Sequence, residues 1–188
     1  MMTFASFRPL TLVAAALLAA GSLTSCKKDV VLKTLDVKLT SQVELNVPNT
    51  PTTPLTGTWT QELDPNANAD VRDNRAKLKK VVVERLAYRV EEYIGAPGTK
   101  ASGTWKFFVN NAPAQIFELG AVSNVDLKNL DDTDAVQDLT ISEEAKTKVV
   151  DAINAGQKVT LVFDGGVTAK PAYARFEVQI FTKLDVGI

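Results

Sequence analysis

The chain of 188 residues has no histidine and only one cysteine, Cys26. Without an imidazole it cannot build a Ser-His-Asp triad, a Cys-His nucleophile or a histidine-ligated zinc site. A single thiol excludes an intramolecular disulfide, so the hydrophobic core has to stabilise the fold alone. The motifs GxGxxG, GxxxxGKS/T and GxSxG are also absent, which removes the common phosphate-binding loops and the nucleophile elbow. We therefore predict that the protein is not an enzyme.

Charge is nearly absent from the first 25 residues, where Arg8 is the only charged side chain. An apolar run follows over residues 10–20. It is too short to span a bilayer, because a membrane helix needs about 20 apolar residues. A short positive region followed by such a run is typical of a secretory signal peptide. We predict that residues 1–25 are a signal peptide and take no part in the fold.

The apolar run leads to Leu23-Thr24-Ser25-Cys26, which resembles the lipobox of bacterial lipoproteins. The resemblance implies that the signal is cut before Cys26, that the thiol carries diacylglycerol and that the new amino terminus is acylated. Several acyl chains make attachment to a membrane effectively permanent. The alternative is an ordinary signal peptide with an incidental cysteine. On the lipoprotein interpretation, residues 26–34 are a lipidated tether, and the lipid on Cys26 is the one non-protein group we expect.

The residues after Cys26 bear on the location of the protein. Lys27 stands where, in proteobacterial lipoproteins, an aspartate signals retention in the inner membrane. Surface-displayed lipoproteins of Bacteroidota carry an acidic cluster there, whereas this chain has only Asp29. The resemblance therefore implies an exported protein, anchored in the outer membrane and facing the periplasm.

Removing the first 25 residues leaves 163, with 20 basic and 22 acidic side chains. Such a balance argues against nucleic acid as a partner, since nucleic acid requires clustered positive charge. It also predicts no polybasic membrane patch in addition to the lipid. The length suits one domain with its own core, which we place at residues 35–188.

Strict alternation of apolar and polar residues marks two long strands, 35–47 and 174–186. A third strand, 158–164, precedes Gly165-Gly166; we interpret the glycine pair as a turn signal and expect strands 158–164 and 174–186 to pair antiparallel. Weaker patterns predict a helix at 70–78 and strands at about 80–93, 104–109 and 115–122. Residues 143–155 form the clearest helix, with Ser142 as N-cap and Gly156 as its end.

These elements predict a mainly all-β chain, an antiparallel β-sandwich of immunoglobulin-like type with one or two short helices in its crossovers. From about residue 80 onward, the order KKVVVERLAYRV, a helix, VTLVFDG and a long final strand also resembles small, uncharacterised envelope lipoproteins of Bacteroidota. That resemblance implies a sandwich domain and brings no catalytic residues.

One segment could bind a metal. Asp64, Asn66, Asn68 and Asp70 place four oxygen-bearing side chains at alternate positions, as a Ca²⁺ loop does. The pattern departs from an EF-hand, because Ala69 replaces the turn glycine and Arg75 the bidentate glutamate. The alternative is a polar loop whose side chains bond their own backbone. The acidic run from Asp131 to Asp138 is a weaker candidate of the same kind.

Exposed aromatic rings are candidates for stacking on a sugar. Trp59, Tyr88 and Tyr173 are the ones we select, whereas Trp105 within TWKFFV is expected to fill the core. The leading hypothesis is a structural or partner-binding module of the cell envelope, with the sheet edges and the Pro/Thr-rich segment after residue 47 as contact surfaces. A glycan-binding module is the alternative. A carboxylate hydrolase comes third and needs two facing acids. Glu91-Glu92 and Glu143-Glu144 do not suggest it, since adjacent residues point to different faces of a strand or a helix.

Overall fold

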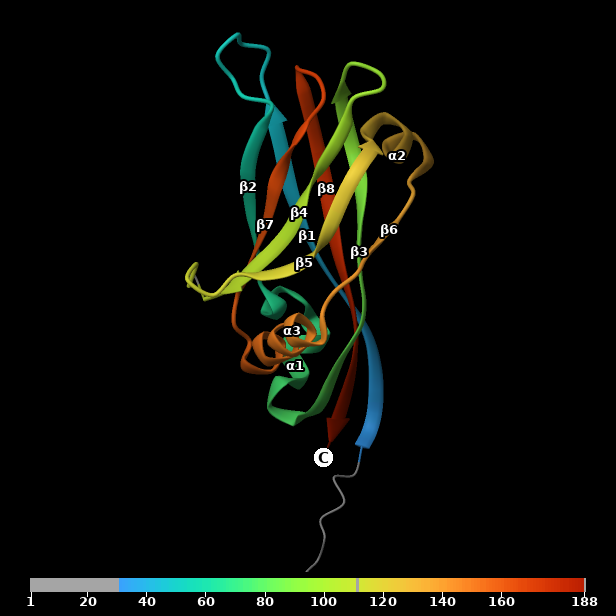
Figure 1. Ribbon diagram of the computed structural model, residues 1–188. Coiled ribbons are helices and arrows are strands. Elements are labelled where there is room, and N and C mark those ends of the chain that lie inside the picture. The colour runs from blue at the N-terminus through green and yellow to red at the C-terminus, as the bar shows by residue number, and fades with distance from the viewer. Residues whose placement is uncertain (1–30, 111, 188) are drawn as a thin grey trace, which may run out of the picture.

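The segments with the clearest alternation become neighbouring strands of one sheet. The computed structural model describes residues 31–110 and 112–187. In the first sheet, β1 (Val31–Val47) pairs with β8 (Ala172–Gly187), which pairs with β3 (Leu78–Gly95), and β6 (Gln137–Leu139) lies outside β3. The second sheet contains β2 (Thr56–Leu63), β7 (Val159–Val167), β4 (Lys100–Val109) and β5 (Phe117–Asp126), in that order. The sheets stack face to face (Figure 1), which confirms the antiparallel all-β sandwich.

The strand order refines the predicted type of sandwich. Strands pair antiparallel as β1 with β8, β2 with β7, β3 with β6 and β4 with β5, as if one long hairpin were rolled up. Eight strands in the orders β1-β8-β3-β6 and β2-β7-β4-β5 have jelly-roll topology. An immunoglobulin domain has a different order and strand number, so the immunoglobulin-like prediction is wrong at this level.

The expected pairing of strands 158–164 and 174–186 is also wrong, because β7 and β8 lie in different sheets. Gly165 and Gly166 do not form a turn but continue β7. A Cβ on Gly165 would lie 2.4 Å from the Ser102 carbonyl oxygen and 2.7 Å from Gly103 Cα. Gly103 and Gly165 therefore permit the close approach of β4 and β7.

We expect Gly103→Ala to lower the unfolding free energy by about 1–3 kcal/mol, as overpacking does. Its Cβ would lie 2.6 Å from the Asp164 carbonyl oxygen and 2.7 Å from Gly165 Cα, and backbone atoms cannot move aside as a flexible side chain can. Urea unfolding measures the change. Thr104→Ala, at the next position of β4, is the control and should cost less than about 1 kcal/mol. Equal losses in the two variants would contradict the close approach.

Helices fill the end of the sandwich where the first sheet is longer. β1, β8 and β3 have 17, 16 and 18 residues, whereas β2, β7, β4 and β5 have 8 to 10. The short helices η1 (Pro65–Ala67), α1 (Ala69–Asn74) and η2 (Arg75–Lys77) precede β3, and α3 (Glu143–Ala155) precedes β7. Figure 1 shows α1 and α3 below the second sheet. They bury Val71, Val149 and Ile153 against the overhang of the first sheet.

The predicted helix 143–155 is confirmed at both ends. Ser142 Oγ accepts a hydrogen bond from the Ala145 amide at 3.1 Å, and Gly156 has φ of +60°. Other boundaries shift: β1 begins at Val31 instead of 35, and the strand expected at 115–122 runs over Phe117–Asp126. Strand β2, the short β6 and helix α2 (Leu127–Thr133) were not expected.

The core between the sheets centres on aromatic rings. Trp105 lies 4.9 Å from Phe163 and 5.6 Å from Phe176 between ring centroids, and Tyr88 lies 6.1 Å from Phe176. All four side chains are buried, and such clusters stabilise a fold beyond their area. Within the described residues, no helix is long and apolar enough to cross a membrane.

Candidate functional site

The outer face of the first sheet carries polar side chains in rows across three strands. The register places Gln42 of β1, Glu177 of β8 and Arg89 of β3 in one row. The next row contains Glu44, Arg175 and Glu92. The sequence assigns these residues to the solvent face but does not show which of them are neighbours, because that depends on register.

An irregularity in β3 brings two adjacent glutamates to this same face. The register between β3 and β8 shifts between Val90 and Glu92, as in a β-bulge. Arg175 Nε lies 3.4 Å from Glu91 Oε2, and Arg175 Nη2 lies 3.2 Å from Glu92 Oε2. The prediction that these adjacent glutamates point to different faces is therefore wrong for Glu91 and Glu92.

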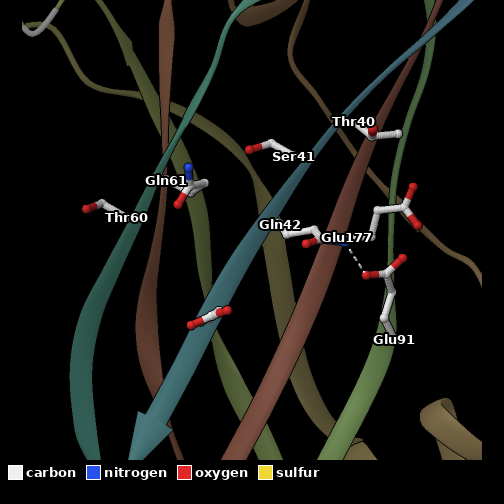
Figure 2. A pocket seen from close by; sticks show the side chains of 8 residues that line it. Thr40, Ser41, Gln42, Thr60, Gln61, Glu91 and Glu177 are labelled. Carbon is white, nitrogen blue, oxygen red and sulfur yellow. Dashed lines mark hydrogen bonds between the residues drawn. The ribbon is translucent and has the colours of Figure 1, made fainter.

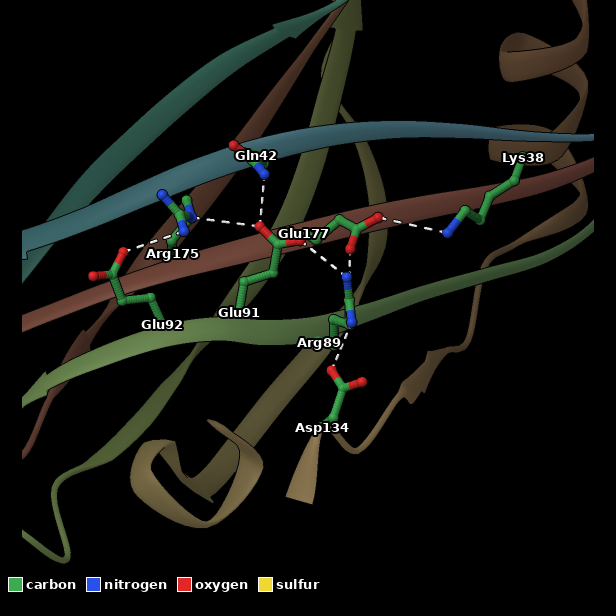
Figure 3. A network of polar contacts seen from close by, with 8 residues as sticks. All are labelled: Lys38, Gln42, Arg89, Glu91, Glu92, Asp134, Arg175 and Glu177. Atoms are coloured by element: carbon green, nitrogen blue, oxygen red, sulfur yellow. Dashed lines mark hydrogen bonds and ion pairs between the residues drawn. The ribbon is translucent and has the colours of Figure 1, made fainter. Parts of the chain in front are cut away.

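Glu177 is the centre of an ion-pair network on this face (Figure 3). It is only 6% exposed, and its Oε2 accepts a hydrogen bond from Arg89 Nε at 2.5 Å. Lys38 Nζ lies 3.7 Å from Oε1. The guanidinium of Arg89 also contacts Glu91 at 3.0 Å and Asp134 at 2.6 Å. A buried carboxylate thus has cationic partners on both neighbouring strands.

The network sets the protonation of Glu177. Burial by itself raises the pKa of a carboxyl, but hydrogen bonding with Arg89, Glu91 and Gln179, together with the positive charge of Arg89, holds the pKa of Glu177 below its usual value. The same hydrogen bond raises the pKa of Arg89 further above its ordinary value. Glu177 and Arg89 are therefore both charged at neutral pH.

A polar groove lies between the edge of the first sheet and the edge of the second (Figure 2). Its volume is about 660 Å³. Gln42 Nε2 donates to Glu91 Oε2 at 2.6 Å, and Ser41 Oγ donates across the gap to the Glu62 carbonyl oxygen at 3.1 Å. The residues that line the groove come from β1, β2, β3 and β8: Thr40, Ser41, Gln42, Glu44, Thr60, Gln61, Glu91 and Glu177.

The chemistry of the groove favours recognition by hydrogen bonds. Glu91 and Glu177 both contact the Arg89 guanidinium. A general acid needs a raised pKa, whereas the pKa of Glu177 is lowered. The hydroxyl and amide side chains can donate and accept hydrogen bonds. β1 and β2 are edge strands, and edge strands present backbone groups that no strand pairs with on one side.

The aromatic residues chosen from the sequence do not form a platform. Tyr88 is 3% exposed and packs between the sheets, so its selection as a ligand-binding residue is wrong, and burial raises its pKa to about 12. Trp59 is half-buried and stacks on Phe163 at 6.1 Å. Tyr173 lies on the outer face, where burial and then the charge of Glu44 raise its pKa. Trp105 fills the core as predicted.

Two residues of the proposed calcium loop, Asp64 and Asn68, act as helix caps. Asp64 Oδ1 accepts from the Asn66 amide at 2.8 Å and caps η1, while Asn68 Oδ1 accepts from the Val71 amide at 3.2 Å and caps α1. Asn66 Oδ1 accepts from Arg75 Nη1 at 3.1 Å. Asp70 lies in the first turn of α1. The Arg75 guanidinium therefore takes up the Asn66 oxygen that a metal ion would need. The arrangement corresponds to the alternative interpretation, a polar loop whose side chains bond their own backbone.

Three carboxylates of the acidic run form ion pairs with three different basic side chains. Asp132 pairs with Lys128, Asp134 with Arg89 and Asp138 with Arg85. Over residues 31–110 and 112–187, no three His, Cys, Asp or Glu side chains are grouped as metal ligands. Cys26 precedes the described residues, so its lipidation stays a prediction.

No protein-family profile and no curated protein matches the sequence. Two solved structures similar to the chain are those of Desmodium yellow mottle tymovirus and turnip yellow mosaic virus. The first has 11% identity and a TM-score of 0.31, covering 100% of this chain and 93% of that chain. The second has 15% identity and a TM-score of 0.31, covering 83% of this chain and 96% of that chain. Likeness at this level does not assign a function to the chain.

Proposed function

We propose that the protein is an exported lipoprotein whose sandwich binds a protein partner in the cell envelope. Lipid on Cys26 anchors it in the outer membrane on the periplasmic side. The LTSC segment supports the anchor, because it ends a signal-like apolar run and resembles a lipobox. The binding function is carried by the groove between the edges of β1 and β2.

The groove suits an extended segment of polypeptide. An extended segment can hydrogen-bond to the backbone of an edge strand, while pockets for alternate side chains give specificity. Thr40, Gln42 and Gln61 supply neutral hydrogen-bonding groups along the groove. Behind them, ion pairs of Glu91 and Glu177 with Arg89 hold the base of the groove in place. A preorganised surface of this kind loses less conformational entropy on binding.

A photo-crosslinking residue at Gln61 tests the binding site in the cell envelope. We expect one major crosslinked protein, and we expect Thr60→Arg to reduce its yield at least about tenfold, because a bulky cation would block the groove. The matched control places the photo-crosslinking residue at Ser123, which is exposed on β5, the opposite edge strand of the second sheet. Similar products from Gln61 and Ser123, or none from Gln61, would contradict the proposal.

Metabolic labelling with palmitate tests the anchor. We expect Cys26→Ser to abolish labelling and to release the protein from the membrane fraction, because the acceptor thiol is gone. Ser25→Ala is the control: the lipobox that the chain resembles accepts alanine at this position, so labelling should persist. Undiminished labelling of the Cys26→Ser protein would overturn both the anchor and the location.

A further inference from the structure

The fold gathers basic side chains at one end of the sandwich. Residues 72–80, RDNRAKLKK, contain five basic residues and one acid, Asp73. They form the turn from α1 through η2 into β3. Lys33 of β1 joins them, because Lys33 and Leu78 both pair with Val186 of β8. Figure 1 shows the start of β1 and the end of β8 together at this end.

The charge at this end is mostly positive and exposed. Lys33, Lys77, Lys79 and Lys80 are all exposed. Of the residues that the structure describes, two acidic side chains lie among them: Asp73 pairs with Arg72 at 2.9 Å, and Asp185 accepts from Thr34 Oγ1 at 2.8 Å. Overall composition hides this cluster, since acids elsewhere balance it. This cluster departs from the even charge balance on which the prediction of no polybasic membrane patch was based.

This end is also the one that the anchor would hold at a membrane. Cys26 precedes Val31, the first residue of β1, by five positions. Even fully extended, that stretch spans only about 17 Å. The stretch between Cys26 and Val31 contributes two further positive charges, Lys27 and Lys28, and one negative charge, Asp29. Charges so close to a bilayer surface lie within about one or two Debye lengths of the headgroups and feel the field of anionic lipids.

We propose that the basic end formed by Lys33 and residues 72–80 docks on anionic phospholipid headgroups of the membrane that carries the anchor. This inference rests on the proposed anchor at Cys26. Docking orients the long strands away from the bilayer. Thr40 lies nine residues beyond Val31 along β1, so the start of the groove would stand roughly 30 Å from the membrane surface. The groove would then face a protein partner in the periplasm and would not contact lipid.

Vesicle co-sedimentation of unlipidated protein tests the docking separately from the anchor. The protein comprises residues 26–188 with Cys26→Ser, which includes every described element. We expect it to bind vesicles with 30% phosphatidylglycerol in phosphatidylethanolamine at low salt and to bind phosphatidylcholine vesicles at least about tenfold more weakly. Raising the salt from about 0.05 M to about 0.5 M should release it, because screening weakens attraction between charges.

Two triple variants with equal net charge decide whether the basic end is responsible. Lys33→Gln, Lys77→Gln and Lys80→Gln together should weaken binding at least about tenfold. Lys100→Gln, Lys106→Gln and Lys128→Gln together should leave it within about twofold, since these lysines lie on β4 and α2. Circular dichroism verifies that both variants are folded. Equal weakening in both, no effect of the first triple, or no binding to anionic vesicles would overturn the docking, and none of these outcomes bears on palmitate labelling.

Discussion

Phe176→Ala is expected to lower the unfolding free energy by about 3–5 kcal/mol, the range for removing a buried aromatic side chain. Phe176 is fully buried on β8 and contacts three other rings. Truncation leaves a cavity bordered by Trp105 and Phe163, which sit on the opposite sheet. Neither sheet can close the gap without disturbing its own strand pairing. Denaturant unfolding, followed by tryptophan fluorescence, measures the loss.

The same strand provides a matched control. Phe181 lies on the opposite face of β8, half-buried, with the Arg85 guanidinium 5.2 Å from its ring centroid. Phe181→Ala should cost about 1 kcal/mol, because it removes partly exposed area and one cation–π contact. Similar losses for Phe176→Ala and Phe181→Ala would show that the rings between the sheets do not stabilise the fold more than the surface does.

The two long strands and the main helix could be predicted from the sequence. In segments 35–47 and 174–186 one face meets the core and the other meets solvent, so alternation marks each strand. The structure joins them as β1 and β8 along their whole length. Helix 143–155 was predictable because Ser142 and Gly156 satisfy its ends locally. Alternation and helix caps depend on residues that are close in sequence, so both can be read from one sequence alone.

Pairing between distant strands was not predictable in the same way. Gly165-Gly166 has the composition of a turn, yet neighbouring strands require those glycines: β4 at Gly165 and the start of β2 at Gly166. Nothing local in the sequence identifies either strand. Strand β2 was not predicted because it is an edge strand in which Leu63 is the one buried residue. Strand β3 alternates poorly because its register shifts at Val83/Arg85 and Val90/Glu92. Each irregularity inverts the pattern that a period of two predicts.

The site was less predictable than the fold. Selection by residue type chose Tyr88, which the core absorbs, and the Asp64 loop, which caps helices. The groove and its network use Gln42, Arg89 and Glu177, which look like ordinary solvent-facing residues in sequence. Their importance comes from three strands meeting in one register, so a carboxylate on the central strand becomes buried between cations.

We expect Arg89→Ala to lower the unfolding free energy by about 3 kcal/mol at pH 7, because it leaves the Glu177 carboxylate buried without its main partner. Lys38, at 3.7 Å, is too distant to replace a hydrogen bond of 2.5 Å. Arg85→Ala is the matched control. Arg85 lies on the same strand and pairs with Asp138, whose side chain is 69% exposed, so its loss should cost less than about 1 kcal/mol.

The pH dependence of the Arg89→Ala effect separates lost charge pairing from lost packing. In the native chain the pKa of Glu177 is lowered, so the stability it contributes is present above its unfolded pKa of about 4.3 and is lost as pH falls through the lower folded value. Without Arg89, burial raises the folded pKa above the unfolded one, so the carboxyl destabilises the variant at neutral pH and protonation relieves this in acid. The difference between native chain and variant should therefore shrink from pH 7 to pH 4. A difference that stays constant across this range would mean that Arg89 stabilises the sheet through its aliphatic stem alone.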